Sequence, residues 1–299
     1  MQKINPSSRR QFISLSGKAL ASAALLSASG NVFAANKEEL TVGNIMDAFI
    51  AEVQGAPFEK TVDTLKAGNR DIKVRGVITT MFATIEIINK AIASGVNFII
   101  AHEPTFYNHL DETKWLENDD VFNYKMNLLK KHNIAVWRNH DYIHSHVPDG
   151  VDNYVIKQLG WTKSYDTTTG IAMINPMNLQ QLIAHAKQSL KIKELRYIGS
   201  PQQSCKKILL MPGASGGQNQ IKAIGRQKPD VLMCGEIQEW ETAEYVRDAR
   251  SKGDDLSLII LGHIPSEEPG SAYMADWLKK KFPSIRTTHI GANSPFSYA

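Results

Sequence analysis

Histidine and acidic residues directly follow four apolar runs, each of which has the length and composition of a buried strand. They are His102 and Glu103 after residues 96–101, His140, Asp141 and His144 after residues 134–137, Glu236 after residues 230–234, and His263 and Glu267 after residues 256–261. Six of the nine histidines lie between residues 102 and 146. Imidazole and carboxylate groups without thiolates suit zinc, manganese, iron or nickel. The pattern therefore predicts a metal site built from histidine and acidic ligands.

Helical and strand-like segments alternate from residue 36 onward. We expect strands over residues 74–79, 96–101, 134–137, 207–211, 230–234, 256–261 and 285–288. We expect helices over residues 41–54, 84–94, 120–132, 151–159, 179–190, 239–251 and 268–281. This alternation is typical of an α/β fold with mainly parallel sheets, here in two similar lobes over about residues 36–165 and 166–299. Ligands bind at the carboxyl ends of the strands in such sheets, so the polar residues that follow the strands should converge.

The first residues have the pattern of an export signal. Residues 7–13 read Ser-Ser-Arg-Arg-Gln-Phe-Ile, an alanine-rich stretch follows over 19–28, and small residues stand at 31–35. A charged start, a short apolar stretch and a small-residue exit indicate a secretory signal over residues 1–34. The paired arginines resemble a twin-arginine signal. That route exports folded proteins, commonly ones that must acquire a cofactor first, and it predicts a periplasmic or secreted protein.

The charge of the chain gives no reason to expect an acidic partner. The formal net charge is +4, but residues 1–34 contribute Lys3, Arg9, Arg10 and Lys18 and no acid, which leaves the remainder at zero. A neutral body does not predict nucleic-acid binding. No apolar run reaches the roughly 18 residues that a membrane span needs. Two cysteines, Cys205 and Cys234, are too few for a disulfide scaffold, and their pairing with each other stays open.

A glycine-rich loop over residues 212–217 offers a rival chemistry. Gly213-Ala214-Ser215-Gly216-Gly217 fits the pattern of a nucleophilic serine between a strand and a helix, with Asp230 or Asp254 and then His263 in the chain order of many hydrolases. The competing interpretation is a glycine loop that lets the backbone approach a ligand or a neighbouring subunit closely. Because His263 also belongs to the metal pattern, we favour the second interpretation over a serine hydrolase using Ser215.

Four motifs in order resemble the NIF-three-like family. They are Ala-His-Glu-Pro-Thr-Phe-Tyr-Asn-His at 101–109, the glycine-rich loop, Cys-Gly-Glu-Ile at 234–237 and Gly-His-Ile-Pro-Ser-Glu at 262–267. The resemblance runs over about residues 40–299. It implies a two-lobed α/β subunit, a centre of two divalent metal ions, and a ring-shaped homohexamer. Members of that family are also described as type 2 GTP cyclohydrolases.

The resemblance implies a ligand set with two exchanges. The family's ligands fall on His102, Glu103, His144, His263 and Glu267, where Glu103 replaces a histidine and His144 replaces an aspartate. The exchange keeps three histidines and two carboxylates, so the number of ligands and their charge are unchanged. Asp141 is the alternative to His144 as the donor in that segment.

Two neighbouring cations repel each other, so the centre needs a bridging ligand, for which Glu267 and Glu103 are the candidates. A metal-dependent hydrolase of a small-molecule substrate is the function we expect, with Glu236 or His140 acting as base or orienting a ligand. The alternative is a protein that stores or delivers metal without catalysis.

Overall fold

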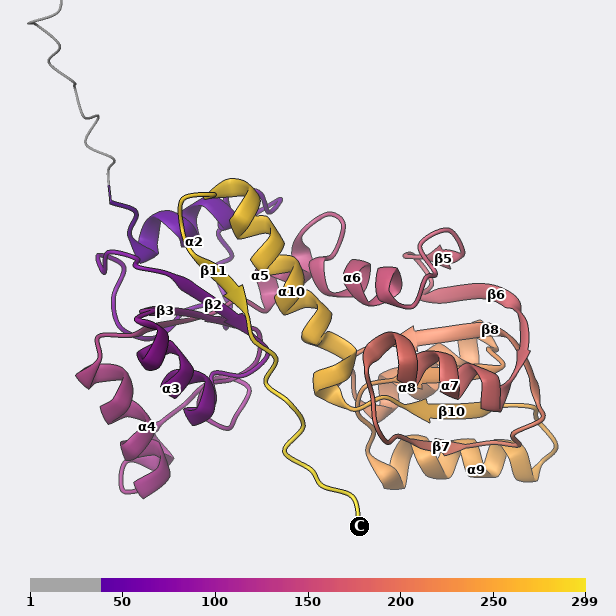
Figure 1. Ribbon diagram of the computed structural model, residues 1–299. Helices are drawn as coiled ribbons and strands as arrows, with labels where there is room; N and C mark the ends of the chain where they lie inside the picture. The colour runs from indigo at the N-terminus through magenta and orange to yellow at the C-terminus, as the bar shows by residue number, and fades with distance from the viewer. Residues whose placement is uncertain (1–38) are drawn as a thin grey trace, which may run out of the picture. The chain divides into compact units, whose positions relative to one another are not determined.

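The computed structural model describes residues 39–299, and its strands form two sheets (Figure 1). The predicted signal over residues 1–34 lies outside the described residues. The first sheet has the order β1-β4-β3-β2-β11. The edge strand β1 pairs with β4 in the antiparallel sense, and all other neighbouring strands of this sheet are parallel. Its strands are β1 (Leu65–Ala67), β2 (Val77–Thr80), β3 (Phe98–Ala101), β4 (Ala135–Arg138) and β11 (Thr287–His289).

The second sheet has the order β5-β6-β8-β9-β10-β7. Its centre, β8-β9-β10, is parallel, whereas β5 and β6 pair antiparallel on one side of it and β7 pairs antiparallel on the other. Its strands are β5 (Tyr165–Asp166), β6 (Ile171–Asn178), β7 (Arg196–Ile198), β8 (Ser204–Met211), β9 (Val231–Cys234) and β10 (Ser257–Ile260). The α/β fold class is confirmed, but parallel pairing in this sheet is limited to its centre.

The helices have local reasons to begin and end where they do. Thr41 closes a capping box on the first of them, Thr84 and Asp119 cap two others, and Gly95 ends one in the left-handed conformation. The helices are α2 (Val42–Ile50), α3 (Ile85–Ser94), α4 (Asp120–Lys131), α5 (Asp141–Ser145), α6 (Gly150–Gln158), α7 (Leu179–Leu190), α8 (Gly217–Gln227), α9 (Glu244–Ser251) and α10 (His263–Lys281), with short turns at Lys114–Leu116 and Glu239–Ala243.

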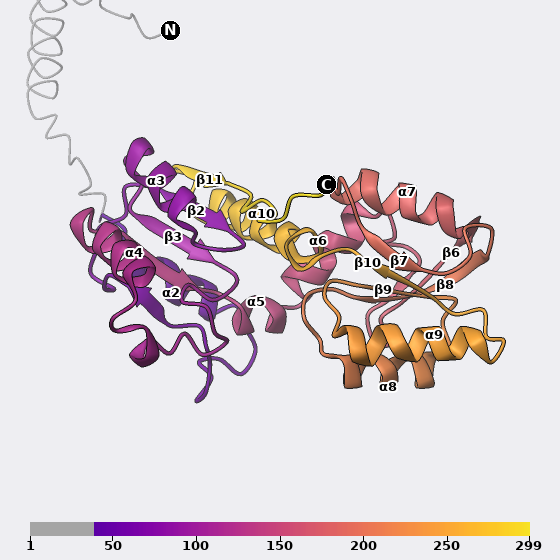
Figure 2. The same ribbon diagram turned by 90° about the horizontal axis from the view of Figure 1, so that it is seen from below.

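Each sheet is covered by helices on both faces (Figure 2). Alternate strand residues point to opposite faces, so Ile78, Ile99 and Val136 pack with α3 and α4, whereas Phe98 and Trp137 pack with α2 and α10. In the second sheet, α8 and α9 cover one face and α7 covers the other. Sheets covered on both faces explain the continuous apolar runs of their central strands. Among residues 39–299, no helix is both long and apolar enough to cross a bilayer.

The longest helix, α10, begins earlier than the sequence predicts. The sequence predicts a helix from residue 268, but α10 starts at His263, with Pro265 in its first turn and Pro269 inside it. A proline is tolerated in the first turn, where its missing N–H has no intrahelical partner. The early start places His263 and Glu267 one turn apart on the same helix. The helix then leads back to the first sheet, where β11 pairs with β2, although the sequence grouped residues 285–288 with the second lobe.

The two cysteines are buried, free and far apart. Cys205 lies on β8 and Cys234 on β9, where Cys234 is opposite Met211. Six residues separate Cys205 from Met211 along the strand, which is a distance of roughly 20 Å. A disulfide needs Cα atoms within about 7 Å, so these two cannot pair in this fold.

Candidate metal centre

The predicted ligands come together at the carboxyl ends of three strands, β3 and β4 of the first sheet and β10 of the second. His102 and Glu103 follow β3. His140 is the N-cap residue of the short helix α5 after β4, and His144 lies within that helix. His263 and Glu267 lie in the first two turns of α10, which follows β10. Two groups could each hold a cation, because their ligand atoms lie within 4.8 Å of one another. One group is His102, His140 and His144, and the other is His102, Glu103 and Glu267. His102 belongs to both.

Each of the four histidines has its Nδ1 atom held by an oxygen acceptor. Nδ1 of His102 lies 3.2 Å from the carbonyl oxygen of Asn139. The other three Nδ1 atoms contact carboxylates, at 3.0 Å for His140 and Asp141, 2.9 Å for His144 and Asp149, and 2.8 Å for His263 and Glu236. An acceptor at Nδ1 favours a proton there and leaves the lone pair on Nε2. This is the arrangement by which proteins orient imidazole ligands toward a metal.

The Nε2 atom of His102 fits the role of a donor to a cation. It is buried and makes no hydrogen bond within the described residues, and Oε2 of Glu267 lies 3.4 Å away. A buried polar atom without a partner is costly unless something else satisfies it. The rings of His102 and His140 stack at 4.8 Å, and that of His144 lies 5.1 Å and 5.0 Å from them. Three imidazoles this close avoid mutual repulsion when their lone pairs face a shared cation.

Protonation differs among the histidines. Burial and the neighbouring His102 lower the pKa of His140 to about 4, so this ring is neutral and can donate at neutral pH. Burial alone would lower the pKa of His144, but the hydrogen bond to Asp149 raises it to about 9. His263 is likewise desolvated, yet its contacts with Glu103, Glu236 and Glu267 raise its pKa to about 12. His144 and His263 are therefore protonated at neutral pH, and a cation that binds to either ring must displace a proton from it.

The two buried carboxylates face these histidines. Glu103 and Glu267 are each about 6% exposed. Nε2 of His263 lies 3.2 Å from Oε1 of Glu103 and 3.0 Å from Oε2 of Glu267. Burial would raise the pKa of either carboxyl group, but the hydrogen bonds and charge of the histidines hold both below their ordinary value. Both glutamates are therefore ionised at neutral pH.

The geometry distinguishes His144 from Asp141. Oδ2 of Asp141 accepts hydrogen bonds from Thr61 at 2.7 Å and from the backbone N–H of Val62 at 3.0 Å, and Oδ1 contacts His140. Both oxygens of Asp141 are thus engaged in holding the loop and the His140 ring. His144 instead lies in the first group of candidate ligands. Asp141 thus contacts this group through the ring of His140.

The two residues predicted to act as a base or to orient a ligand, His140 and Glu236, both contact the candidate ligands. His140, expected as a base or an orienting residue, joins the group of candidate ligands. Glu236 contacts Nδ1 of His263 and is 54% exposed, so it orients that ring from the solvent side. Its hydrogen bond with His263 lowers the pKa of Glu236, which leaves the carboxylate ionised at neutral pH.

Three residues that position the site were missed in the sequence. Asp63, which is 4% exposed, accepts hydrogen bonds from the backbone N–H groups of His140, Asp141 and Tyr142 and so holds the start of α5. Asp149 holds His144, and the fully buried Arg138 contacts Glu103. Arg138 alone left a signal, since it is a charged residue in direct continuation of an apolar strand.

The glycine-rich loop serves the candidate metal centre. A Cβ atom on Gly213 would lie 2.0 Å from Oε1 of Glu267, so only glycine leaves room for that carboxylate. A Cβ on Gly217, in the first turn of α8, would meet the carboxylate of Glu241 at 2.1 Å, so an acid of this chain already lies at that helix terminus. The loop thus packs against two carboxylates of the chain itself.

The serine hydrolase alternative is not assembled. Both ring nitrogens of His263 contact carboxylates of glutamates. Asp230 accepts hydrogen bonds from the backbone N–H groups of Lys206 and Lys207, and Asp254 pairs with Lys252. Neither aspartate orients a histidine toward Ser215 in these contacts.

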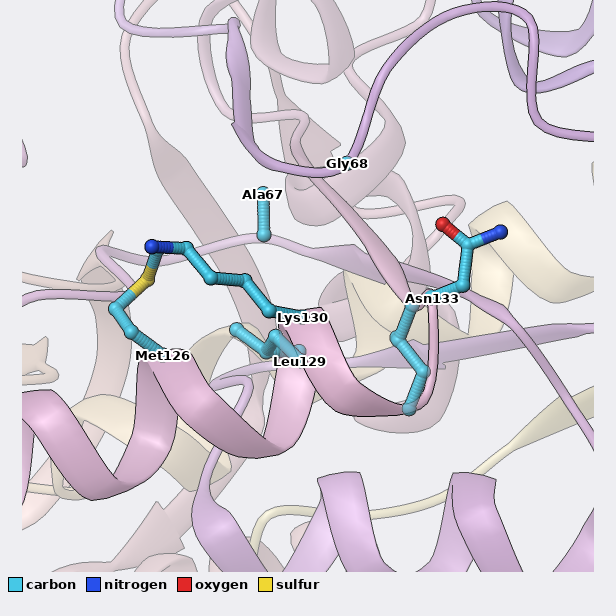
Figure 3. A pocket seen from close by; sticks show the side chains of 7 residues that line it. Ala67, Gly68, Met126, Leu129, Lys130 and Asn133 are labelled. Atoms are coloured by element: carbon cyan, nitrogen blue, oxygen red, sulfur yellow. The ribbon is translucent and has the colours of Figure 1, made fainter.

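A small hollow of about 220 Å³ lies elsewhere in the first lobe, between the end of β1 and helix α4 (Figure 3). Ala67, Gly68, Met126, Leu129 and Lys130 are among the residues that line it. None of the candidate ligands lines this hollow, and no histidine or acidic side chain does. It therefore offers no second place for metal chemistry.

Comparison with known proteins places this arrangement in a family. A family model described as Duf34/NIF3 (NGG1p interacting factor 3) matches residues 58–294. A Clostridium acetobutylicum protein named "GTP cyclohydrolase 1 type 2 homolog" is 25% identical over 227 residues, covering 72% of this chain and 80% of that protein. A protein of the same name from Clostridium perfringens is 24% identical over 231 residues, covering 74% and 84%.

The solved structure of a Bacillus cereus protein related to NIF3 shares the fold. It superimposes with a TM-score of 0.71 at 16% sequence identity, over 88% of this chain and 100% of that chain. The fold that the four motifs implied is thereby confirmed. Because the family match spans most of the chain and includes every candidate metal ligand, this chain belongs to the Duf34/NIF3 family.

Proposed function

We propose that this protein is an exported hydrolase whose active site holds two divalent metal ions. The observation that supports it is the gathering of four histidines, each held at Nδ1 by an oxygen acceptor, with two buried glutamates. One ion would be held by His102, His140 and His144. Because the lone pair of His102 can serve only one ion, the other ion would be held by Glu103 and Glu267 together with His263, whose Nε2 contacts both carboxylates. Zinc, manganese, iron and nickel all accept this donor set.

Hydrolysis is the reaction that suits such a pair of ions. Two divalent cations would polarise the bond to be broken and lower the pKa of a water molecule toward neutrality. The chain contributes the rest. Asp141, Asp149 and Glu236 keep the imidazole rings oriented, and burial of Glu103 and Glu267 keeps the charges in a poorly solvated site. Glu236, ionised and half exposed, is placed to accept a proton at the solvent side.

The reaction class agrees with the names of the relatives, which are those of cyclohydrolase homologues. GTP is not the substrate that we propose for this chain. Residues 1–34 have the pattern of a twin-arginine signal, so we propose that the protein acts in the periplasm or outside the cell, where GTP is not supplied. A small hydrolysable molecule of that compartment is the substrate we propose.

Metal content and turnover, measured on the same sample, test this function. The mature protein is purified after native export and analysed by mass spectrometry for metals, then assayed against ester, amide, phosphoester and cyclic amidine substrates before and after chelation. We expect about two ions per chain and a hydrolysis that chelation abolishes and metal restores. Fewer than two ions that exchange within minutes, with no turnover, would instead indicate the storage or delivery role.

A further inference from the structure

Arg138 is the buried partner of Glu103. It ends β4, and its side chain is 0% exposed. Nη2 donates to Oε2 of Glu103 at 3.3 Å, Nε donates to the carbonyl oxygen of His102 at 3.3 Å, and Nη1 donates to the carbonyl oxygen of His109. Nη1 also lies 3.6 Å from Oδ2 of Asp111. The guanidinium therefore contacts both residues that follow β3.

The two carboxylate oxygens of Glu103 contact different partners. Oε2 faces Arg138, whereas Oε1 lies 3.2 Å from Nε2 of His263 and 3.7 Å from Nε2 of His140. A carboxylate that is free to rotate can offer both oxygens to one cation. Arg138 occupies one of them, so Glu103 has a single oxygen to offer toward the histidines.

We propose that Arg138 is a positioning residue that makes Glu103 a donor through one atom, as an imidazole would be. The inference rests on the proposed metal binding. Its chemical sense comes from the exchange noted in the sequence, where Glu103 stands at a position that the family resemblance gives to histidine. Histidine donates through one nitrogen, and a glutamate tied at one oxygen imitates it.

The dependence also runs in the other direction. A fully buried guanidinium needs a negative partner, because removing one member of a buried ion pair leaves an uncompensated charge. Apart from Glu103, Asp111 is the other carboxylate in contact with Arg138, and Asp111 is already shared with Lys66 at 3.2 Å. Histidine at position 103 would therefore be tolerated only if Arg138 lost its charge as well.

The test is a double-mutant cycle on the full mature protein with Co²⁺ as the probe. Arg138→Met removes the charge with little change in volume, Glu103→His restores the histidine, and the double variant does both. We expect each single change to weaken Co²⁺ binding at one site by about 10- to 100-fold, the range that follows loss of a group supporting a ligand. We expect the double variant to bind within a few-fold of the wild type.

The visible spectrum of bound Co²⁺ separates positioning from a general structural effect, because its intensity follows the number of donor atoms. Arg138→Met should change that spectrum as Glu103 becomes free to use both oxygens. Arg250→Met is the matched control, since it makes the same change at a partly buried arginine of α9 that contacts Gln203 and Leu256 rather than Glu103 or Asp111. Its Co²⁺ affinity and spectrum should equal those of the wild type.

Two results would overturn the inference: wild-type affinity and spectrum in Arg138→Met, or a double variant that binds no better than Glu103→His. A wild-type protein that binds no Co²⁺ would contradict the proposed function instead. The unfolding midpoint of each variant, measured in the presence of a chelator, checks that the variant folds without metal. If Arg138→Met does not fold, Arg138→Gln takes its place, because glutamine keeps one N–H donor for Glu103. For that variant we expect a loss of Co²⁺ affinity smaller than that of Glu103→His.

Discussion

Gly213 and Glu267 are in direct apposition, so closely that a methyl group on the glycine would meet a carboxylate oxygen at 2.0 Å. The two residues come from different elements, the glycine-rich loop after β8 and the second turn of α10. The loop is also tied to that helix by a hydrogen bond from the N–H of Gly213 to the hydroxyl of Ser266 at 3.0 Å. The loop therefore forms the wall against which a candidate metal ligand rests.

Replacing Gly213 by alanine should displace Glu267 and reduce the metal content by at least one ion per chain. Gly216→Ala is the matched control, because both glycines have positive φ, +63° and +79°, but Gly216 has open space around it. Both variants should lose roughly 1–2 kcal/mol of stability from the backbone conformation. Equal metal contents in the two variants, measured by mass spectrometry, would mean that Glu267 is not a ligand.

His144 and Asp141 should respond differently to removal. His144→Ala deletes a candidate donor and should leave one ion per chain at saturating supply. Asp141→Ala deletes only the partner of the His140 ring, so two ions should still bind, with an affinity reduced by about 10- to 100-fold. A competition titration with a chromogenic chelator measures both. The opposite order of effects would make Asp141 the donor.

Lys125 should make stability depend on pH above 8. It is 4% exposed, and burial lowers its pKa from 10.5 to about 8, which Asp111 only partly opposes. Between those values the unfolded chain holds a proton that the folded chain has lost, so the free energy of unfolding rises with pH. Relative to Lys125→Met, the wild type should gain up to about 3 kcal/mol from pH 7.5 to pH 10.5.

Urea unfolding of both proteins at several pH values checks the prediction for Lys125, since other titrating groups cancel in the difference. Lys131→Met, an exposed change on the same helix, should show no such trend. A difference between wild type and Lys125→Met that stays constant over the range would mean that Lys125 keeps its proton when folded.

Export should depend on the paired arginines. Changing Arg9 and Arg10 to lysine keeps the charge but breaks the twin-arginine pattern, so the precursor should accumulate in the cytoplasm. Immunoblots of cytoplasmic and periplasmic fractions would reveal the block, with a single Lys3→Arg change as the control. Undiminished export of the double variant would exclude the twin-arginine route.

The mature protein should form a closed ring of six chains, as the family resemblance implies. The near-zero net charge of residues 35–299 does not oppose such association. Light scattering after size-exclusion chromatography should give a mass near six times that of the mature chain. A mass close to one chain would contradict this expectation.

Much of the fold could be predicted because its signals are local. Thr41 and Thr84 cap helices where expected, and the buried strands end within a residue or two of the predicted positions. The antiparallel strands β1, β5, β6 and β7 were missed, because each is partly exposed and lacks the continuous apolar run of a buried strand. Helix α5 was missed as well, since its cap is supplied from Asp63, far away in the chain.

The candidate ligands could be predicted from their residue types, but their supporting partners could not. His102, His144 and His263 all follow apolar runs, which is visible in the sequence. The partners of their Nδ1 atoms are a carbonyl group, Asp149 and Glu236, which depend on side-chain rotamers and on contacts between separate elements. Nothing in the spacing distinguished Asp141 from His144 until their neighbours were known.

The contact between Glu103 and His263 closes a separation of 160 residues along the chain. Contacts of such long range form late in folding, because a large loop must close before they gain anything. A growing polypeptide cannot bring these two side chains together until nearly all of it has been synthesised. Any cation held between these two residues would therefore be acquired by the finished, folded molecule.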